Sequence, residues 1–449
     1  MSQDIRIKKG LNIKLKGKAE KTLSELKRTE VYAIKPTDFQ GVIPKLTVKV
    51  GDAVKAGDIL FYSKANELVK FASPVSGSIK EITRGAKRRI LEIRITADSE
   101  DTYKDFGKKD PTKLSTEEIK DYLSEAGCFP YFIQRPYDVV VDPNDSPKAI
   151  FISTFSSAPL AADEAFALQG QEEAFQTGIN VLKKLTSGEV HLSVNGDETS
   201  FFNKIEGAIV HRVFGKHPSG NVGVQINKIN PINQGERVWT LKPQDVAIIG
   251  RLFLTGKYDA TRVFALAGSE VQKPHYYKAK QGVNLELLFQ QQVQNSNVRY
   301  INGDVLTGKW VRKNNFLSFY NTLISVIPEG DHYTFFGWMP FTQNNLFSMS
   351  RTFLSWLTPN KEYELDTNMN GEERAMVLTG EMESVFPMDI YPMQLLKATL
   401  VSDIEKMEKL GIYEVAPEDF ALIDFTSSSK VEAQAIIREG LDLMIKEVG

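Results

Sequence analysis

The stretch from residue 44 to residue 82 reads PKLTVKVGDAVKAGDILFYSKANELVKFASPVSGSIKEI and decides the fold expected for the first part of the chain. Apolar and polar residues alternate in short runs, a pattern typical of half-buried β-strands. Gly51, Gly57 and Gly77 interrupt these runs, and glycine accepts the positive φ angles that tight turns need. The stretch therefore predicts a small β domain of short strands joined by tight turns.

This pattern resembles the barrel-sandwich hybrid of biotinyl and lipoyl domains, and we assign it to 1–110. Carrier domains of that kind hold their cofactor on a lysine at an exposed hairpin tip, usually after Asp or Met. Lys64 lies near the corresponding place, but Ser63 precedes it. We therefore interpret Lys64 as a solvated, unmodified lysine. A lipoyl-like carrier or adaptor protein with no redox role remains the alternative function.

Length and composition narrow the class of protein. A chain of 449 residues is long enough for about three domains. A net charge of −2 provides no general field for nucleic acid, so we expect no nucleic-acid partner. No apolar run approaches the roughly 18–20 residues of a membrane span, and the N-terminus lacks the apolar core of a secretory signal. We expect a cytoplasmic protein.

Cysteine and histidine usage argues against a metal centre. Cys128 is the single cysteine, so this chain cannot supply a cysteine-rich zinc site or a four-cysteine iron–sulfur cluster. The five histidines are scattered, and the closest pair, His211 and His217, has no established ligand spacing. We expect this chain to bind no metal and no redox cofactor.

Strands and helices alternate through the middle of the chain. A capping box at Ser115 begins a helical linker over 111–128. Strands are predicted at 149–154, 190–194 and 208–213, with an amphipathic helix over 172–185. This alternation predicts a parallel α/β domain over 129–256.

The first strand of this α/β domain lacks a nucleotide-binding signature. A dinucleotide site would show G-x-G-x-x-G after that strand, whereas this chain has STFSSAPL at 153–160. We expect its hydroxyl groups to cap a helix rather than bind phosphate. The domain is therefore predicted to be Rossmann-like without the nucleotide motif.

Later segments complete the organisation. Residues 214–237 are rich in Gly, Pro and Asn and are predicted to form a long functional or interfacial loop. A β-rich domain with one helix is expected over 257–330. The rest, 331–449, contains an unusually aromatic segment over 331–356 and amphipathic helices at 392–410 and 431–448.

The aromatic segment shows neither helical nor strand periodicity, which favours a docking surface for protein, a lipid edge or a quinoid ligand. An irregular linker packed on the core is the alternative. The candidate docking residues are His217, Tyr333, Phe336, Trp338, Phe341 and Trp356.

Four long motifs occur in order along nearly the whole chain: VKVGDAVKAGDILF, IFISTFSSAPLAAD, HRVFGKHPSGNVG and GEERAMVLTGEMESVFPMDIYP. In this order and spacing they resemble the A subunits of Na+-translocating NADH:quinone oxidoreductases. The resemblance implies a peripheral, cofactor-free subunit on the cytoplasmic face of the bacterial inner membrane. It also implies a β-grasp-like domain at 257–330.

The same resemblance implies five other subunits as partners, with membrane contact only through them. Flavins and iron–sulfur centres of those partners would carry electrons from NADH to ubiquinone or menaquinone while Na+ is pumped. The isolated chain would not be catalytic.

A contribution to quinone binding is also implied. A quinone headgroup needs an apolar slot and one or two hydrogen-bond donors. The segment FPYFIQRPY at 129–137 offers aromatic rings beside polar groups. The alternative is that Phe132 and Tyr137 are core residues at the start of the α/β domain. The candidate quinone-binding residues are Phe129, Tyr131, Phe132, Gln134, Arg135 and Tyr137.

Overall fold

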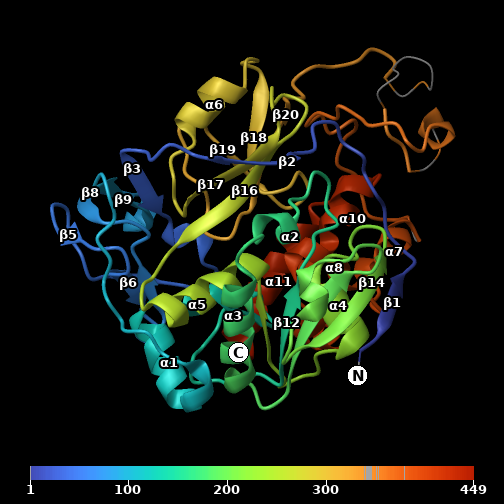
Figure 1. The fold of residues 1–449 in the computed structure, drawn as a ribbon. Coiled ribbons are helices and arrows are strands. Elements are labelled where there is room, and N and C mark those ends of the chain that lie inside the picture. Colours follow the sequence, from blue (N-terminus) through green and yellow to red (C-terminus); the bar gives the residue numbers. More distant parts are fainter. Residues whose placement is uncertain (1, 338, 340–345, 350, 352, 379) are drawn as a thin grey trace.

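A computed structural model describes residues 2–337, 339, 346–349, 351, 353–378 and 380–449. Four β-sheets form the framework of this described part (Figure 1). Two small sheets make the barrel expected around residues 44–82. One orders β3 (Val31–Ile34), β9 (Ile90–Ala97), β8 (Gly77–Arg84) and β5 (Ala53–Val54), and the other orders β4 (Pro44–Leu46), β6 (Ile59–Ser63) and β7 (Lys70–Ala72).

Two strands within the first thirty residues pair outside this barrel. Strand β1 (Asp4–Ile7) runs parallel to β14 (Ile209–Gly215), and β2 (Glu20–Glu25) runs parallel to β17 (His275–Lys280). Each occupies a position at the edge of a larger sheet, where the unpaired backbone groups of the neighbouring strand accept a further strand.

The α/β layer is a seven-stranded sheet. Its strands lie in the order β1, β14, β13 (Glu189–Asn195), β12 (Ala149–Ser153), β15 (Val238–Leu241), β10 (Ile133–Arg135) and β11 (Val139–Val140). The first five are mutually parallel, and β10 and β11 are added at one edge by antiparallel pairing. The predicted parallel strands are thus confirmed.

Helices cover both faces of this sheet. Helices α3 (Glu172–Leu185) and α5 (Pro243–Thr255) pack together on one face with Ile150 and Ile152 of β12. On the other face, α4 (Val222–Ile229) packs against Ala149 and Phe151. This alternation of faces along β12 is what a strand buried on both sides requires.

Helix α4 corrects the prediction of a continuous loop over 214–237. Its sequence, VGVQINKI, places Val224 and Ile226 in the buried interior. The Gly, Pro and Asn residues that suggested a loop lie mainly on either side of this short helix. The packing of the apolar residues overrides the low helix propensity of the flanking sequence.

The third large unit is a six-stranded sheet. It orders β19 (Lys309–Val311), β18 (Val298–Asn302), β20 (Leu323–Pro328), β16 (Thr261–Ala267), β17 and β2. The helix expected within 257–330 forms as α6 (Glu286–Gln292). Helix α1 (Thr116–Glu125), with the expected capping box at Ser115, connects the barrel to the α/β layer.

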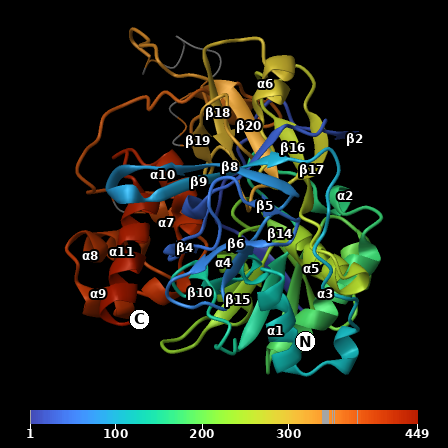
Figure 2. The ribbon, with the colours of Figure 1, turned by 90° about the vertical axis from the view of Figure 1, so that its left-hand side faces the viewer.

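The C-terminal part is helical: α7 (Glu381–Val385), α8 (Pro392–Leu400), α9 (Ile404–Lys409), α10 (Ala421–Thr426) and α11 (Ala433–Glu447). The single helix expected over 392–410 is two helices, because Ser402 adopts a positive φ and Asp403 caps the start of α9. Leu400 is exposed at this break. In Figure 2 these helices lie at the left, and the long β8–β9 hairpin crosses the front.

The described residues of the aromatic segment after β20 lie mainly at the upper right of Figure 1, away from the sheets. Tyr333 and Phe335 are almost fully exposed, and Trp356 is about half exposed. Phe347 instead contacts Tyr363, so part of the segment packs on the core. No helix among the described residues is both long and apolar enough to cross a membrane.

Candidate functional site

A cavity of about 380 Å³ lies at the carboxyl ends of the parallel strands. The chain runs from β12 outward through β13 to β14 and then returns to form β15 on the other side of β12. Ser153 at the end of β12 and Leu241 at the end of β15 both line the cavity. Ligands of open α/β sheets bind in the crevice at such a reversal of strand order.

Acidic side chains outnumber basic ones on the cavity wall. Its carboxylates are Asp38, Asp138, Glu164, Asp245, Asp304 and Glu418, and its lysine and arginine side chains are Lys242 and Arg135. A wall of this composition repels phosphate and favours a neutral or cationic ligand.

Apolar residues fill much of the remaining wall. They include Tyr131, Ile133, Phe155, Ala158, Ala161, Ala162, Val222, Leu241, Pro243, Tyr320 and Leu323. A volume of a few hundred cubic ångströms is typical of small-molecule sites, although polar and charged residues make up more than half of this wall.

Arg135, at the end of β10, is held by carboxylates from the C-terminal part. Its Nη1 donates to Asp419 Oδ2 at 3.1 Å and its Nη2 to Glu418 Oε1 at 2.5 Å. Both carboxylates lie on the 3₁₀ helix η8 (Pro417–Phe420). The Nε atom, 3.9 Å from Asp138 Oδ1, is buried without a hydrogen-bond partner.

Two acids on the opposite wall are already engaged. Glu164 accepts from Gln244 Nε2 at 3.1 Å and from Thr322 Oγ1 at 2.9 Å, and burial raises its pKa. Asp245 pairs with the fully buried Arg262, although burial raises the pKa of Asp245 as well. These two carboxyls therefore fix the wall between α5 and the six-stranded sheet.

His217 also lines the cavity and is 3% exposed. Its Nδ1 lies 3.1 Å from Ser157 Oγ, whereas its Nε2 is buried without a partner. Burial lowers its pKa to about 4. Among the described lining residues, Arg135 Nε and His217 Nε2 are therefore the two buried nitrogen atoms with unmet hydrogen-bonding capacity.

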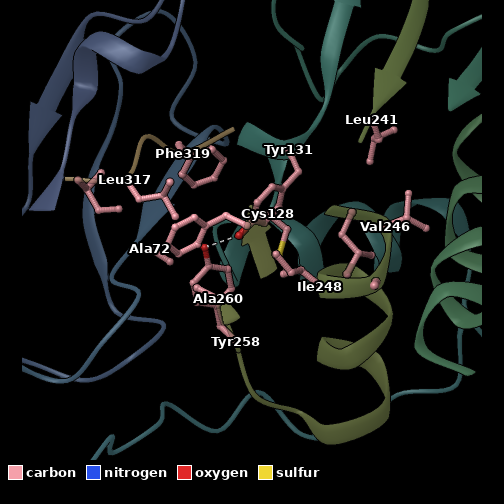
Figure 3. Packing of buried hydrophobic residues seen from close by; sticks show 14 of the residues in the cluster. Ala72, Cys128, Tyr131, Leu241, Val246, Ile248, Tyr258, Ala260, Leu317 and Phe319 are labelled. Atoms are coloured by element: carbon pink, nitrogen blue, oxygen red, sulfur yellow. Dashed lines mark hydrogen bonds between the residues drawn. The ribbon is translucent and has the colours of Figure 1, made fainter. Parts of the chain in front are cut away.

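Among the aromatic candidate residues of 129–137, one lines the cavity and others lie in the hydrophobic core. The Tyr131 ring backs the cavity, but its hydroxyl lies 2.8 Å from that of Tyr258 and donates to Gln281 in the interior (Figure 3). Phe129 and Phe132 are fully buried core residues, and Phe132 packs edge-on against Trp239. The surroundings of Phe132 are therefore those of a core residue, as the alternative interpretation of this segment predicts.

The other candidates are dispersed. Gln134 is buried within β10, and Tyr137 packs edge-on against Tyr413; the wall of the cavity includes neither. Among the docking candidates, Tyr333, Phe336 and Trp356 are exposed on the aromatic segment, whereas His217 is buried at the cavity wall. Trp338 and Phe341 lie outside the described residues.

The hydroxyl groups after β12 do not cap a helix, which corrects that expectation. Ser153 Oγ donates to Gly220 O at 2.9 Å, and Ser157 Oγ accepts from Gly220 N–H at 2.8 Å. The following helix α2 (Glu164–Ala167) is capped by Asp163 instead. The hydroxyls thus join the ends of β12 and β14 beside the cavity.

Several lining residues escaped prediction from the sequence, notably Glu164, Lys242 and Tyr320. Lys242 Nζ donates to the backbone oxygen of Tyr320 at 2.9 Å, and Tyr320 Oη donates to Pro130 O at 2.6 Å. These contacts join segments that are far apart along the chain, so no local motif reveals them. Among the described residues, no group of three or more His, Cys, Asp or Glu side chains is placed to hold a metal ion.

Comparison with known proteins gives the family. Residues 5–98 match the NqrA N-terminal barrel-sandwich hybrid domain, residues 114–258 the NqrA second alpha/beta domain, and residues 263–313 the NQRA C-terminal domain. The chain is 36% identical over 450 residues to the NqrA subunit of the Na+-translocating NADH-quinone reductase of Hahella chejuensis, covering 99% of this chain and 100% of that protein. The chain belongs to the NqrA family.

Other NqrA relatives match over a similar length. The NqrA proteins of Cellvibrio japonicus and Vibrio anguillarum are 36% and 35% identical, covering 97% and 99% of this chain and 98% and 100% of their own. A solved structure of an NAD+-reducing [NiFe]-hydrogenase matches over 68% of this chain and 55% of the hydrogenase chain, at 10% sequence identity. Its TM-score of 0.35 is too low to indicate a shared fold. The resemblance drawn from the motifs and the barrel-sandwich fold of the N-terminal domain are confirmed.

Proposed function

We propose that this chain is a peripheral subunit of a six-subunit Na+-pumping NADH:quinone oxidoreductase and that its cavity binds the headgroup of ubiquinone or menaquinone. Membership of the NqrA family, whose curated members are named as subunits of a Na+-translocating NADH-quinone reductase, supports the place in the complex. The chain lies at the cytoplasmic face of the bacterial inner membrane and works in a respiratory chain.

The observation that carries quinone binding is the chemistry of the cavity wall. A quinone is neutral, has a flat apolar ring and presents carbonyl oxygens that accept hydrogen bonds. The cavity offers apolar side chains among its polar ones, more acidic than basic side chains, and buried nitrogen atoms of Arg135 and His217 without partners. Buried N–H groups without partners are rare in native proteins, and a bound carbonyl would satisfy them.

Redox chemistry is assigned to the partner subunits. Flavins and iron–sulfur centres there carry the electrons, because such chemistry needs prosthetic groups rather than side chains alone. This chain contributes docking and a quinone-binding surface and is not catalytic in isolation.

Docking to the other five subunits is assigned to the aromatic segment, and membrane contact occurs only through those partners. Tyr333, Phe335 and Trp356 present large apolar side chains to solvent. Exposed aromatic residues of this kind are the usual anchors of protein interfaces.

We also assign domains to this architecture: a Rossmann-like α/β domain at 129–256, a β-grasp-like domain at 257–330 and a C-terminal region at 331–449. The parallel order β14-β13-β12-β15 supports the first assignment. The barrel-sandwich hybrid domain is assigned to 1–110, of which β1 and β2 join the two larger sheets, and a helical linker to 111–128.

Quinone titration of the purified full-length chain tests the binding proposal. Saturable one-to-one binding of short-chain ubiquinone or menaquinone is expected by calorimetry. Ala161→Phe should abolish it, because Ala161 lines the cavity and the larger ring fills it. Ala65→Phe, on the exposed loop after β6, is the matched control and should bind like the wild type. Absent wild-type binding, or unchanged binding by Ala161→Phe, would contradict the proposal.

A further inference from the structure

The backbone of His217 is fixed by a segment from the opposite end of the sequence. Leu11 N–H donates to His217 O at 2.8 Å, and His217 N–H donates to Asn12 Oδ1 at 2.9 Å. The approach at Gly10 is so close that a Cβ there would lie 2.1 Å from His217 O. Three consecutive residues near the N-terminus therefore hold this histidine in one position.

The imidazole ring is fixed by a second set of contacts. Gly220 N–H donates to Ser157 Oγ at 2.8 Å, and that hydroxyl lies 3.1 Å from His217 Nδ1. Among the hydrogen bonds of the described residues the Ser157 hydroxyl has no other acceptor, so its proton is directed to Nδ1. Nδ1 is then the acceptor, and the neutral ring carries its proton on Nε2.

The position of Gly220 is itself restricted. A Cβ at this residue would lie 2.5 Å from Ser157 N and 3.0 Å from Ser157 Oγ. Glycine is therefore required for the backbone of this loop to come close enough to set the orientation of the serine hydroxyl.

The Nε2 atom of His217 is the last group in this series of hydrogen bonds from Gly220 through Ser157 to the imidazole ring. It is buried and has no partner, and His217 is one of the residues that line the cavity. The nearby Asp304 also lines the cavity, but its carboxylate accepts from Leu306 N–H at 2.8 Å and Thr307 N–H at 3.0 Å. An oriented N–H donor at a cavity wall, supported by two layers of hydrogen bonds, is the arrangement of a ligand-binding group.

We propose that His217 is a ligand-binding residue whose Nε2–H donates a hydrogen bond to a carbonyl oxygen of the bound quinone. Ser157 and Gly220 are positioning residues that select this tautomer. The inference rests on the proposed quinone-binding function and names the donor within that site. Burial lowers the pKa of His217 to about 4, so the ring stays neutral near pH 7 and adds no positive charge that would attract an anion.

Two substitutions separate the role of Nε2 from that of the ring. In His217→Gln the amide nitrogen can take the place of Nε2, whereas in His217→Asn it can reach only the place of Nδ1. Short-chain ubiquinone should bind His217→Gln within about 3-fold of the wild type and His217→Asn about 5- to 160-fold more weakly, the range for one lost hydrogen bond that leaves a partner unpaired. Ser157→Ala should fall between them. Thermal unfolding of each variant checks that the fold is retained.

Nitrogen NMR of the full-length chain gives a readout that packing alone would not move. With the ring signals assigned by their loss in His217→Asn, the free protein should show the Nε2–H tautomer near pH 7. Adding ubiquinone should shift the Nε2–H proton signal. In Ser157→Ala the preference for this tautomer should fall.

The outcomes distinguish the two proposals. If the wild type binds neither ubiquinone nor menaquinone, the proposed function fails. If the wild type binds and His217→Asn binds equally well, the assignment of His217 fails while quinone binding stands. The assignment also fails if folded His217→Gln binds as weakly as His217→Asn, or if NMR shows the proton on Nδ1.

Discussion

Replacing Arg135 by Met should destabilise the contact between the α/β layer and the C-terminal helices. The arginine side chain is 3% exposed, and the Asp419 side chain that it contacts is fully buried. Methionine keeps the apolar volume but removes the charge, which leaves Asp419 with the backbone N–H of Ala416 as its donor. Removing one partner of a buried ion pair typically costs about 3–5 kcal/mol, because the remaining charge has no compensation.

The expected loss depends on pH in a defined direction. Burial raises the pKa of Asp419 and raises that of Glu418 to about 7, while Arg135 opposes both shifts. A carboxyl whose pKa is higher in the folded than in the unfolded chain makes folding less favourable as pH rises through that interval. For Glu418 this interval extends from 4.5 to about 7. Without the arginine both pKa values rise further, so Arg135→Met should lose more stability at pH 8 than at pH 5.

Urea unfolding at pH 5 and pH 8, followed by circular dichroism, measures the effect. Hydrogen exchange of η8 and α11 locates it, since the chain has several units that need not unfold together. Arg212→Met is the matched control, because Arg212 pairs with Asp4 on the surface, where water screens the ion pair and its contribution to stability is small. A loss for Arg135→Met no larger than for Arg212→Met, or equal at both pH values, would refute the reasoning.

Three further outcomes are expected. Gly223→Ala should lose about 1–3 kcal/mol in the same unfolding assay, since a Cβ there would lie 2.5 Å from Asp419 Oδ2 and 2.7 Å from Arg135 Nη1; unchanged stability would show that this region can yield. Trp356→Ala should keep wild-type stability within about 0.5 kcal/mol and reduce co-purification with membrane subunits, whereas wild-type retention would place the interface elsewhere. Calorimetry should detect no NADH binding by this chain, because the acidic cavity repels a diphosphate; a micromolar dissociation constant would contradict this.

Local patterns in the sequence predict the elements but not the ways in which they combine. The helix over 172–185 and the capping box at Ser115 form as expected, because apolar periodicity and cap chemistry act within a few residues. Strands β1 and β2 could not be assigned to their sheets, since strand pairing depends on partners about 200 and 250 residues away. The break between α8 and α9 depends on Ser402, whose positive φ no simple pattern indicates.

The site shows the same limit. The segment 129–137 contributes Tyr131 and Arg135 to the cavity, yet its aromatic character mostly reflects the core. An aromatic residue beside a polar one gives the same local pattern whether it lines a cavity or packs inside. Glu164 and His217 reach the cavity through the sheet order, which a single sequence without aligned relatives does not provide.

The polar geometry of the cavity depends on both ends of the chain. The segment at Gly10–Asn12 fixes His217, and η8 near the C-terminus holds Arg135 through Glu418 and Asp419. Neither of these two segments lies within 129–256, the part of the chain assigned to the α/β domain. A fragment limited to 129–256 would therefore retain its parallel strands but lose the contacts that orient both unpaired nitrogen atoms. Assembly of the whole chain, rather than the α/β fold alone, creates the proposed quinone site.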